Sequence, residues 1–317
     1  MLVFCSRGLS QFVHFNEITS ALVYPKPQIL LQRRFNVFGD AVLVLVTLLW
    51  GTTFLIVKDT VAHIAPAWFI LIRFLLGALV LFPFWFRGPR KGLLRASLIL
   101  GSLMYWGFAT QTWALHLTGP NRVAFLTGTS VLLVPTFLWL FRGKKPHRSL
   151  LIGISAATIG MALLLLRPHG FNVGDFFGLV CAFIFAVQII FTGDLSPQYD
   201  ALALSAGQLM VVTVWAFLFT LNTALPMHAI FVAWPYVLYT SLVATAFTTL
   251  AQTWAQKKTA PSHAALIFTL EPLFAMLYTA LMTGRLLTPL GWLGVLLIVG
   301  GTLYAEWVYI QRKPQVA

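Results

Sequence analysis

Apolar residues in this chain gather in long runs, and the gaps between the runs hold Pro, Gly and basic residues. An α-helix needs about 20 consecutive apolar residues to cross the hydrocarbon core of a bilayer. We predict ten such spans, near residues 39–57, 66–86, 96–117, 122–141, 149–167, 175–193, 201–221, 233–255, 262–282 and 289–310. The expected fold class is an all-α integral membrane protein with ten transmembrane helices. Residues 1–38 and 311–317 are expected to form cytoplasmic N-terminal and C-terminal tails.

The polar positions of the chain repeat. The sequence Gln111-Thr112-Trp113-Ala114 returns 141 residues later as Gln252-Thr253-Trp254-Ala255. The same offset relates Thr118 to Thr259, Pro120 to Pro261, Gly143 to Gly284, Gly153 to Gly294 and Gly160 to Gly301, and an offset of 135 relates Gly39-Asp40 to Gly174-Asp175 and Arg73 to Gln208. We therefore expect two repeats of five spans each, residues 39–167 and residues 175–310.

An odd number of spans in each repeat turns the second repeat upside down relative to the first. Inverted repeats form two halves around a site near the bilayer midplane, and this arrangement suits transport by alternating access. The glycine pairs Gly153/Gly160 and Gly294/Gly301 are each seven residues apart, which puts both glycines of a pair on one helix face. That spacing predicts close packing of helices.

Composition agrees with a bilayer environment. Hydrophobic residues make up 59% of the chain and charged residues 9%, whereas a soluble domain carries about 25% charged residues. The net charge of +13 does not indicate nucleic-acid binding here, because the basic residues lie in the short gaps between apolar runs. In that position they determine orientation in the membrane.

With the N-terminus in the cytoplasm, sixteen of the 21 Lys and Arg residues lie on the cytoplasmic side, four lie outside and Arg73 lies within a span. Cytoplasmic loops carry an excess of Lys and Arg. This excess predicts a multi-pass protein of the cell membrane, a bacterial inner membrane, with both termini cytoplasmic. The loop 194–200 departs from the pattern, because it holds Asp194 and Asp200 and no basic residue.

Several short motifs resemble one known family. They are Leu49-Trp50-Gly51-Thr52-Thr53-Phe54, then Pro66 and Arg73, then Ala124-Phe125-Leu126-Thr127 with Pro135, and Leu270-Glu271-Pro272-Leu273-Phe274. In order and spacing they resemble the EamA family of the drug/metabolite transporter superfamily. The resemblance implies a ten-helix inverted repeat that exports small metabolites or amino acids. The chain departs from the family at Gly143-Lys144 and Gly284-Arg285, where the family often has Gly-Glu, so any role of those acids is absent or reversed.

Arg73 and Glu271 are the ionisable residues expected inside spans. A buried charge in a bilayer usually faces a partner or a wet cavity. Arg73 either orients an anionic group of the substrate or ties helices together through carbonyl oxygens. Glu271 either exchanges a proton, pairs with a substrate amine, or makes a structural contact where Pro272 is expected to kink the ninth span. Gln208 takes the place of Arg73 in the second repeat.

Further candidates for substrate binding are polar and aromatic. Ser241, Thr245, Thr248 and Gln252 fall on one face of the eighth span, with Gln111 as the first-repeat equivalent of Gln252. This face either lines the substrate path or packs on a neighbour. Trp50 and Tyr105 are expected deep in the membrane, where they can form aromatic walls, whereas Trp113 and Trp254 fit an interfacial belt. Gln188 is a further polar residue within a span.

The remaining motifs weigh against other classes. No GxxxxGK[ST] loop, HExxH or GxSxG pattern occurs, and two cysteines cannot form a disulfide framework. We therefore expect a secondary transporter for the efflux of a small metabolite, such as an amino acid or an aromatic or amphipathic solute, rather than an enzyme. No cofactor, metal or nucleic acid is expected, and proton coupling is open. A passive channel or facilitator is the alternative, followed by a membrane-embedded enzyme, and nothing in the sequence specifies an oligomeric state.

Overall fold

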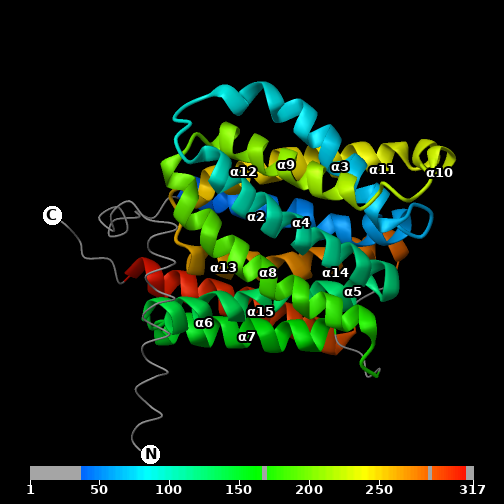
Figure 1. The fold of residues 1–317 in the computed structure, drawn as a ribbon. Helices are drawn as coiled ribbons and strands as arrows, with labels where there is room; N and C mark the ends of the chain where they lie inside the picture. Colours follow the sequence, from blue (N-terminus) through cyan, green and yellow to red (C-terminus); the bar gives the residue numbers. More distant parts are fainter. Residues whose placement is uncertain (1–36, 166–169, 285–287, 312–317) are drawn as a thin grey trace, which may run out of the picture.

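The computed structural model describes residues 37–165, 170–284 and 288–311. Helices account for its regular structure over these ranges (Figure 1). In chain order they are α2 (Val37–Thr60), α3 (Pro66–Leu81), η2 (Phe82–Phe86), α4 (Leu93–Leu117), α5 (Pro120–Gly128), α6 (Ser130–Arg142), α7 (Arg148–Leu165), α8 (Val173–Leu195), η3 (Ser196–Gln198), α9 (Ala201–Leu218), α10 (Met227–Val232), α11 (Trp234–Leu238), η4 (Tyr239–Phe247), α12 (Thr248–Gln256), α13 (Pro261–Phe268), α14 (Leu270–Thr283) and α15 (Pro289–Gln311). The predicted tails, except residues 37, 38 and 311, and Arg285 lie outside the described residues.

Seven helical segments are long and apolar enough to cross a membrane, which confirms an all-helical multi-pass membrane protein. Two further apolar stretches, Arg148–Leu163 within α7 and Pro289–Ala305 within α15, also occur among the described residues. The predicted eighth span, residues 233–255, is covered by α11, η4 and α12, which follow one another without a gap and include a π-helical segment. Over the described residues, seven of the ten predicted spans are thus confirmed by length and apolar composition, and the count of ten stays a prediction.

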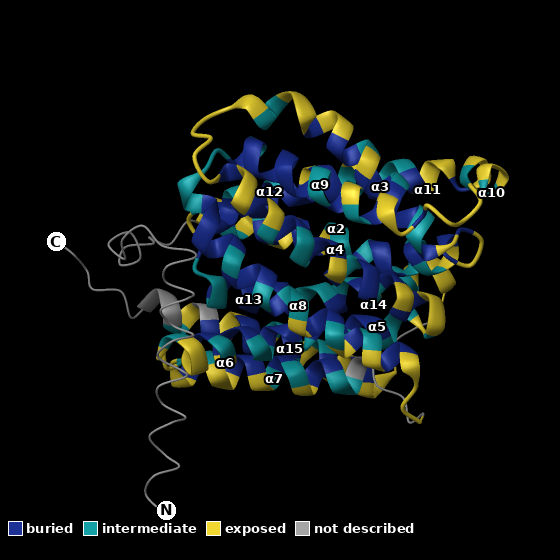
Figure 2. Ribbon diagram, in the orientation of Figure 1, coloured by how far each residue is buried: buried dark blue, intermediate teal, exposed yellow. Residues whose placement is uncertain are grey.

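The surface of the bundle is apolar. Buried residues concentrate where helices face one another, and exposed ones lie on the outer faces (Figure 2). Many of the exposed side chains are large and hydrophobic, such as Phe231 at 83%, Leu296 at 68% and Leu79 at 61% exposure. Exposure of so much apolar surface to water is unfavourable, so this surface is suited to contact with lipid.

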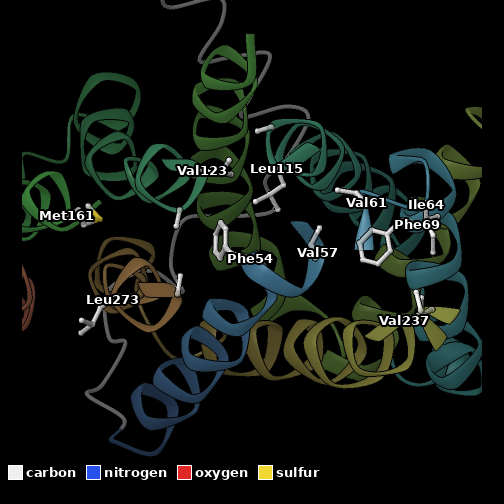
Figure 3. Close-up of a cluster of buried hydrophobic side chains, with 14 of the residues drawn as sticks. Phe54, Val57, Val61, Ile64, Phe69, Leu115, Val123, Met161, Val237 and Leu273 are labelled. Atoms are coloured by element: carbon white, nitrogen blue, oxygen red, sulfur yellow. The ribbon is translucent and has the colours of Figure 1, made fainter. Parts of the chain in front are cut away.

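The interior contains close-packed apolar clusters. Figure 3 shows one of them, in which Phe54 and Val57 of α2 meet Phe69, Val123 and Leu273. These residues come from helices far apart in the sequence, so the cluster joins the two halves of the chain. Each buried aliphatic or aromatic side chain of this kind adds about 1.5–3 kcal/mol relative to exposure to water.

Glycines bring α7 and α15 into direct contact, as their spacing predicts. A Cβ added to Gly153 would lie 2.6 Å from the carbonyl oxygen of Gly301, and a Cβ added to Gly160 would lie 2.5 Å from that of Gly294. The two helices therefore run antiparallel with their backbones touching, and a larger residue at the contact would force them apart.

Two helices are broken at equivalent places. The kink predicted at Pro272 occurs as a break at Thr269, between α13 and α14, because Pro272 cannot donate to the carbonyl one turn earlier. A second break, which the sequence analysis does not predict, separates α5 from α6 at Thr129. The hydroxyls of Thr129 and Thr269 donate to the carbonyls of Leu126 and Leu266 at 2.5 and 2.7 Å. Such bonds to the preceding turn bend helices.

Helices α2 and α8 run in opposite directions. At one end of the bundle, Lys58 near the end of α2 donates to the carbonyl of His116, while Gly174 at the start of α8 lies against Thr118. At the other end, Asp40 at the start of α2 accepts from Thr259, while Gly193 near the end of α8 lies against Pro261. The first helices of the two predicted repeats are thus antiparallel.

Candidate functional site

A cavity of about 700 Å³ lies between the helices, and some of this volume is open to solvent. Its lining comes from both halves of the chain: Trp50, Thr53, Met104, Phe108, Gln111, Thr127, Gly128, Ser130, Phe185, Gln188, Ile189, Thr249, Gln252, Phe268 and Glu271. Of the nine binding residues proposed from the sequence, the lining includes Trp50, Gln111, Gln252 and Glu271.

Polar groups without a protein partner face this space. Among the described residues, Gln111, Gln188, Gln252 and Glu271 have no side-chain hydrogen bond or ion pair. Glu271 lies in the first turn of α14, immediately after the break at Thr269, where the helix dipole favours a negative charge. Three amides and one carboxyl are therefore available to a ligand.

The lining residues pair off under the two sequence offsets. The offset of 135 relates Trp50 to Phe185 and Thr53 to Gln188, and the offset of 141 relates Phe108 to Thr249, Gln111 to Gln252, Thr127 to Phe268 and Ser130 to Glu271. Twelve of the fifteen lining residues belong to these six pairs. The two copies of the repeated Gln-Thr-Trp-Ala motif thus both contribute their glutamine to one cavity.

Aromatic rings form much of the apolar wall. Trp50 and Phe268 have ring centroids 5.5 Å apart, and Phe108 and Phe185 have theirs 5.4 Å apart. The indole of Trp50 donates to the hydroxyl of Thr248 at 3.1 Å, which fixes the orientation of the ring. Thr248 itself is buried behind Trp50, so it supports the wall without being in the lining.

Arg73 lies behind the cavity wall. It is 2% exposed, donates from Nε to the Thr245 hydroxyl at 2.6 Å and from Nη2 to the Ala244 carbonyl at 3.2 Å. Both partners lie in the π-helical segment η4, whose wider turns leave carbonyl groups available to other donors. The Arg73 guanidinium carbon is also 4.8 Å from the ring centroid of Phe108, a lining residue. Arg73 and Thr245 thus join α3 to η4.

Tyr105 and Gln208 lie away from the cavity lining. Tyr105 is 4% exposed and stacks on Trp215 and Phe219 with ring centroids 6.0 and 5.6 Å away. Gln208 is fully buried and donates to Leu204 and Thr253 at 3.4 Å. These two candidates therefore have packing roles in this structure.

The remaining lining residues were not singled out as binding candidates from the sequence. Phe108, Phe185 and Phe268 look like ordinary core aromatics, and Thr53, Thr127, Ser130 and Thr249 look like ordinary helix threonines and serines. The sequence repeat indicates these seven residues, because each occupies the position equivalent to another lining residue under one of the two offsets. Extending the offsets from the conspicuous residues to all polar and aromatic positions would have found them.

Comparison with known proteins agrees with this fold. The model of the EamA-like transporter family matches residues 37–166 and 172–306. An uncharacterized transporter of Archaeoglobus fulgidus is 29% identical over 265 residues, 83% of this chain and 84% of the relative. The uncharacterized transporter YoaV of Bacillus subtilis is 23% identical over 286 residues, 84% of this chain and 96% of the relative. A solved crystal structure shares the fold with a TM-score of 0.70 at 17% identity, over 87% of this chain and 98% of that chain.

An apolar helical bundle around a partly polar cavity, together with these relatives, defines the class: a multi-pass membrane transporter for a small molecule. The chain belongs to the EamA-like transporter family.

Proposed function

We propose that this chain is a secondary transporter that exports a small aromatic or amphipathic amine by alternating access. The moving units are two inverted repeats of five spans, residues 39–167 and 175–310. The observation that carries this proposal is the set of six equivalent residue pairs around one cavity. A site on the axis between inverted repeats can open to either side when the two repeats exchange conformations.

The lining supports an amine over a carboxylate. Glu271 is its one ionisable group, and no Lys, Arg or His is among the described lining residues. A carboxylate and aromatic faces together suit an ammonium group. The sequence indicated Arg73 as a possible partner for a carboxylate of the substrate. In the structure the Arg73 side chain is hydrogen-bonded to Thr245 and Ala244, so it does not present a positive charge to a substrate carboxylate in the cavity.

Glu271 also supports coupling to protons. Its carboxyl can hold either a proton or the substrate ammonium, so binding of one displaces the other. In such an exchange the proton enters from the outside when the amine leaves. The three glutamines stay neutral throughout and bind the polar atoms of the solute.

The orientation follows from the basic residues. Arg142, Lys144, Lys145 and Lys257 lie at the same end of the bundle as Asp40, and this end is assigned to the cytoplasm. The acidic loop after α8 fits there as well, since Asp194 accepts from Arg142 at 3.0 Å and Lys257 donates to the carbonyl of Tyr199 at 2.7 Å. The cell membrane is the proposed location, with both termini cytoplasmic.

Counterflow in proteoliposomes tests the proposal with three probes that share one ring and differ in charge. They are 2-phenylethylamine, phenylalanine and phenylacetate, a cation, a zwitterion and an anion. We expect unlabelled amine inside the liposomes to drive uptake of labelled amine, and phenylacetate not to compete. Glu271→Gln should weaken amine binding about tenfold or more, because a hydrogen bond to a charged group contributes about 1.5–3 kcal/mol.

Each other outcome has a distinct meaning. Exchange of phenylalanine with phenylacetate competing would restore the amino-acid hypothesis and contradict the amine. Uptake without acceleration by internal substrate would indicate the channel or facilitator. Ser130→Ala, at the position equivalent to Glu271, is the matched control and should retain exchange of the amine.

A further inference from the structure

Two acid–base pairs occupy equivalent places in the two halves of the chain. Asp175 at the start of α8 accepts two hydrogen bonds from Arg122 at the start of α5, one of them 2.6 Å long. Asp40 near the start of α2 has its Oδ1 3.3 Å from Nε2 of His263 at the start of α13. The offset of 135 relates Asp40 to Asp175, and the offset of 141 relates Arg122 to His263.

The pairs lie at opposite ends of the bundle, since α2 and α8 are antiparallel. The Arg122 pair adjoins Gly174 and the α7–α8 connection, where Arg122 also donates to the carbonyl of Gly170 at 3.1 Å. The Asp40 pair adjoins Thr259, whose hydroxyl donates to Asp40 at 3.4 Å. The cavity lies between these two ends.

Each pair joins two helices that line the cavity further along. Asp40 precedes the lining residue Trp50 by ten residues, and Asp175 precedes its equivalent Phe185 by ten, about 15 Å along a helix. Likewise, Arg122 and His263 each precede a lining residue, Thr127 and Phe268, by five residues. Breaking either pair would therefore let the cavity helices that it joins move apart at one end only.

The chemistry of the two pairs differs. Arg is charged at all physiological pH values and binds a carboxylate with two parallel bonds. His is charged only when protonated, and its charge changes between about pH 5 and 8. The second carboxylate oxygen of Asp40, Oδ2, is buried without a hydrogen-bond partner in the described part of the chain. One pair is thus permanent and the other depends on pH.

Several other charged groups surround the His263 end. Helix α13 contacts α2, α6, α7 and α8. The described titratable or charged groups on these elements and their connections at this end are Asp40, Arg142, Lys144, Lys145, His147, Arg148, Asp194, Lys257 and Lys258. Arg142 and Asp194 pair with each other, and Lys144, Lys145 and His147 line one cleft with His263. Asp40 is the acidic group that lies against His263, so it is the group through which a proton on His263 strengthens closure.

We propose that Asp175–Arg122 and Asp40–His263 are paired closures at the two ends of the transport cavity, and that the Asp40–His263 closure weakens as pH rises while the other does not. This inference rests on the proposed alternating access. Protonated His263 holds α13 against α2. Loss of that proton removes the positive charge that the Asp40 carboxylate attracts, and the cavity opens at the end assigned to the cytoplasm.

Labelling of one cysteine in the cavity tests this. The background is the full chain with Cys5→Ser and Cys181→Ala, and Ser130→Cys supplies the thiol. A membrane-impermeant maleimide is added to right-side-out or inside-out vesicles at pH 6 and pH 8. Labelling through the His263 end should rise roughly fivefold from pH 6 to 8, beyond the rise of a free thiol, because loss of the imidazolium charge removes its attraction to the Asp40 carboxylate.

Variants separate the two ends. Asp40→Asn should raise labelling through the His263 end at both pH values, and Arg122→Gln should raise it through the opposite end. His263→Arg should remove the pH dependence, and Arg122→His should create one at its own end. Asp175 is left unchanged because it also caps α8 in a capping box with Asn172.

The inference is overturned if His263→Arg keeps the pH dependence, or if neither Asp40→Asn nor Arg122→Gln changes labelling from its own side. Size-exclusion elution shows that each variant is folded, and Arg122→Lys and Asp40→Glu replace any that is not. Absence of counterflow with normal end-specific labelling would instead contradict the proposed function. Counterflow with labelling unchanged in every variant would contradict this inference alone.

Discussion

The guanidinium of Arg73 donates to the hydroxyl of Thr245 across the α3–η4 contact, at 2.6 Å and with both side chains buried. This contact explains how the charge of Arg73 is stabilised among helices that cross the membrane. The Thr245 hydroxyl and the Ala244 carbonyl accept its hydrogen bonds, and the Phe108 ring lies against its guanidinium. The contact also supports Phe108 from behind, so Arg73 reaches the cavity only through that ring.

Replacing Arg73 should therefore affect stability first. Arg73→Ala removes the hydrogen bonds to the Thr245 hydroxyl and the Ala244 carbonyl, and each hydrogen bond to a charged group contributes about 1.5–3 kcal/mol. We expect a lower unfolding temperature in detergent for Arg73→Ala and a smaller decrease for Arg73→Lys. The order of preference among the three phenyl probes should stay the same. A changed preference at unchanged unfolding temperature would place Arg73 in the substrate path.

The two equivalent glutamines should contribute alike to binding. Gln111→Leu and Gln252→Leu each remove one hydrogen bond to the solute, which weakens binding by about two- to tenfold. Binding of labelled amine to purified protein by scintillation proximity measures this. Gln208→Leu, outside the lining, should leave affinity unchanged. Loss of affinity in the Gln208 variant alone would contradict the assignment of the cavity.

Two neighbouring glycines of α15 should respond differently to substitution by alanine, because only one of them lies at the contact with α7. A Cβ on Gly301 would lie 2.7 Å from the Gly153 carbonyl oxygen, whereas one on Gly300 meets nothing within 4 Å. We expect Gly301→Ala to destabilise the protein by about 1–3 kcal/mol through overpacking. Gly300→Ala should stabilise it slightly, because alanine favours helix. Thermal unfolding of the two variants side by side checks this, and equal effects would contradict it.

Trp50 and Thr248 should act as one unit. Thr248→Val removes the acceptor of the indole N–H, and Trp50→Phe removes the donor but keeps a ring. Each single variant should lower amine affinity, and the double variant should lose little more, with a coupling energy of about 0.5–1.5 kcal/mol. Affinity losses that simply add would show that the hydrogen bond does not position the ring.

The sequence was sufficient to predict the apolar helices and the features that repeat along the chain. Apolar runs predicted the helices, because every backbone group in lipid must bond within its own helix. The glycine spacing predicted close helix packing in the fifth and tenth spans, since a missing Cβ has one main use in a membrane helix, and the structure shows that these two helices pack on each other. The doubled Gln-Thr-Trp-Ala motif identified Gln111 and Gln252, which both line the cavity.

The sequence did not show in which direction a side chain points from its helix. Arg73 and Tyr105 lie within helices, but from the sequence a helix face that packs on η4 or α9 cannot be told from one that faces a cavity. The π-helical segment and the break at Thr129 depend on side-chain bonds to carbonyls of nearby turns, which single residues do not specify. Pro272 signalled the break at Thr269 only because proline removes a donor outright.

Among the six equivalent pairs of the lining, Ser130 and Glu271 form the pair in which one member carries a carboxyl and the other does not. Two carboxyls at these places would offer an amine two poses related by half a turn. With one carboxyl, the ammonium has a single anchor, while the indole of Trp50 on one side and the smaller ring of Phe185 on the other fix the rest of the solute. Three unlike points of contact discriminate mirror images, so this cavity should prefer one enantiomer of a chiral amine.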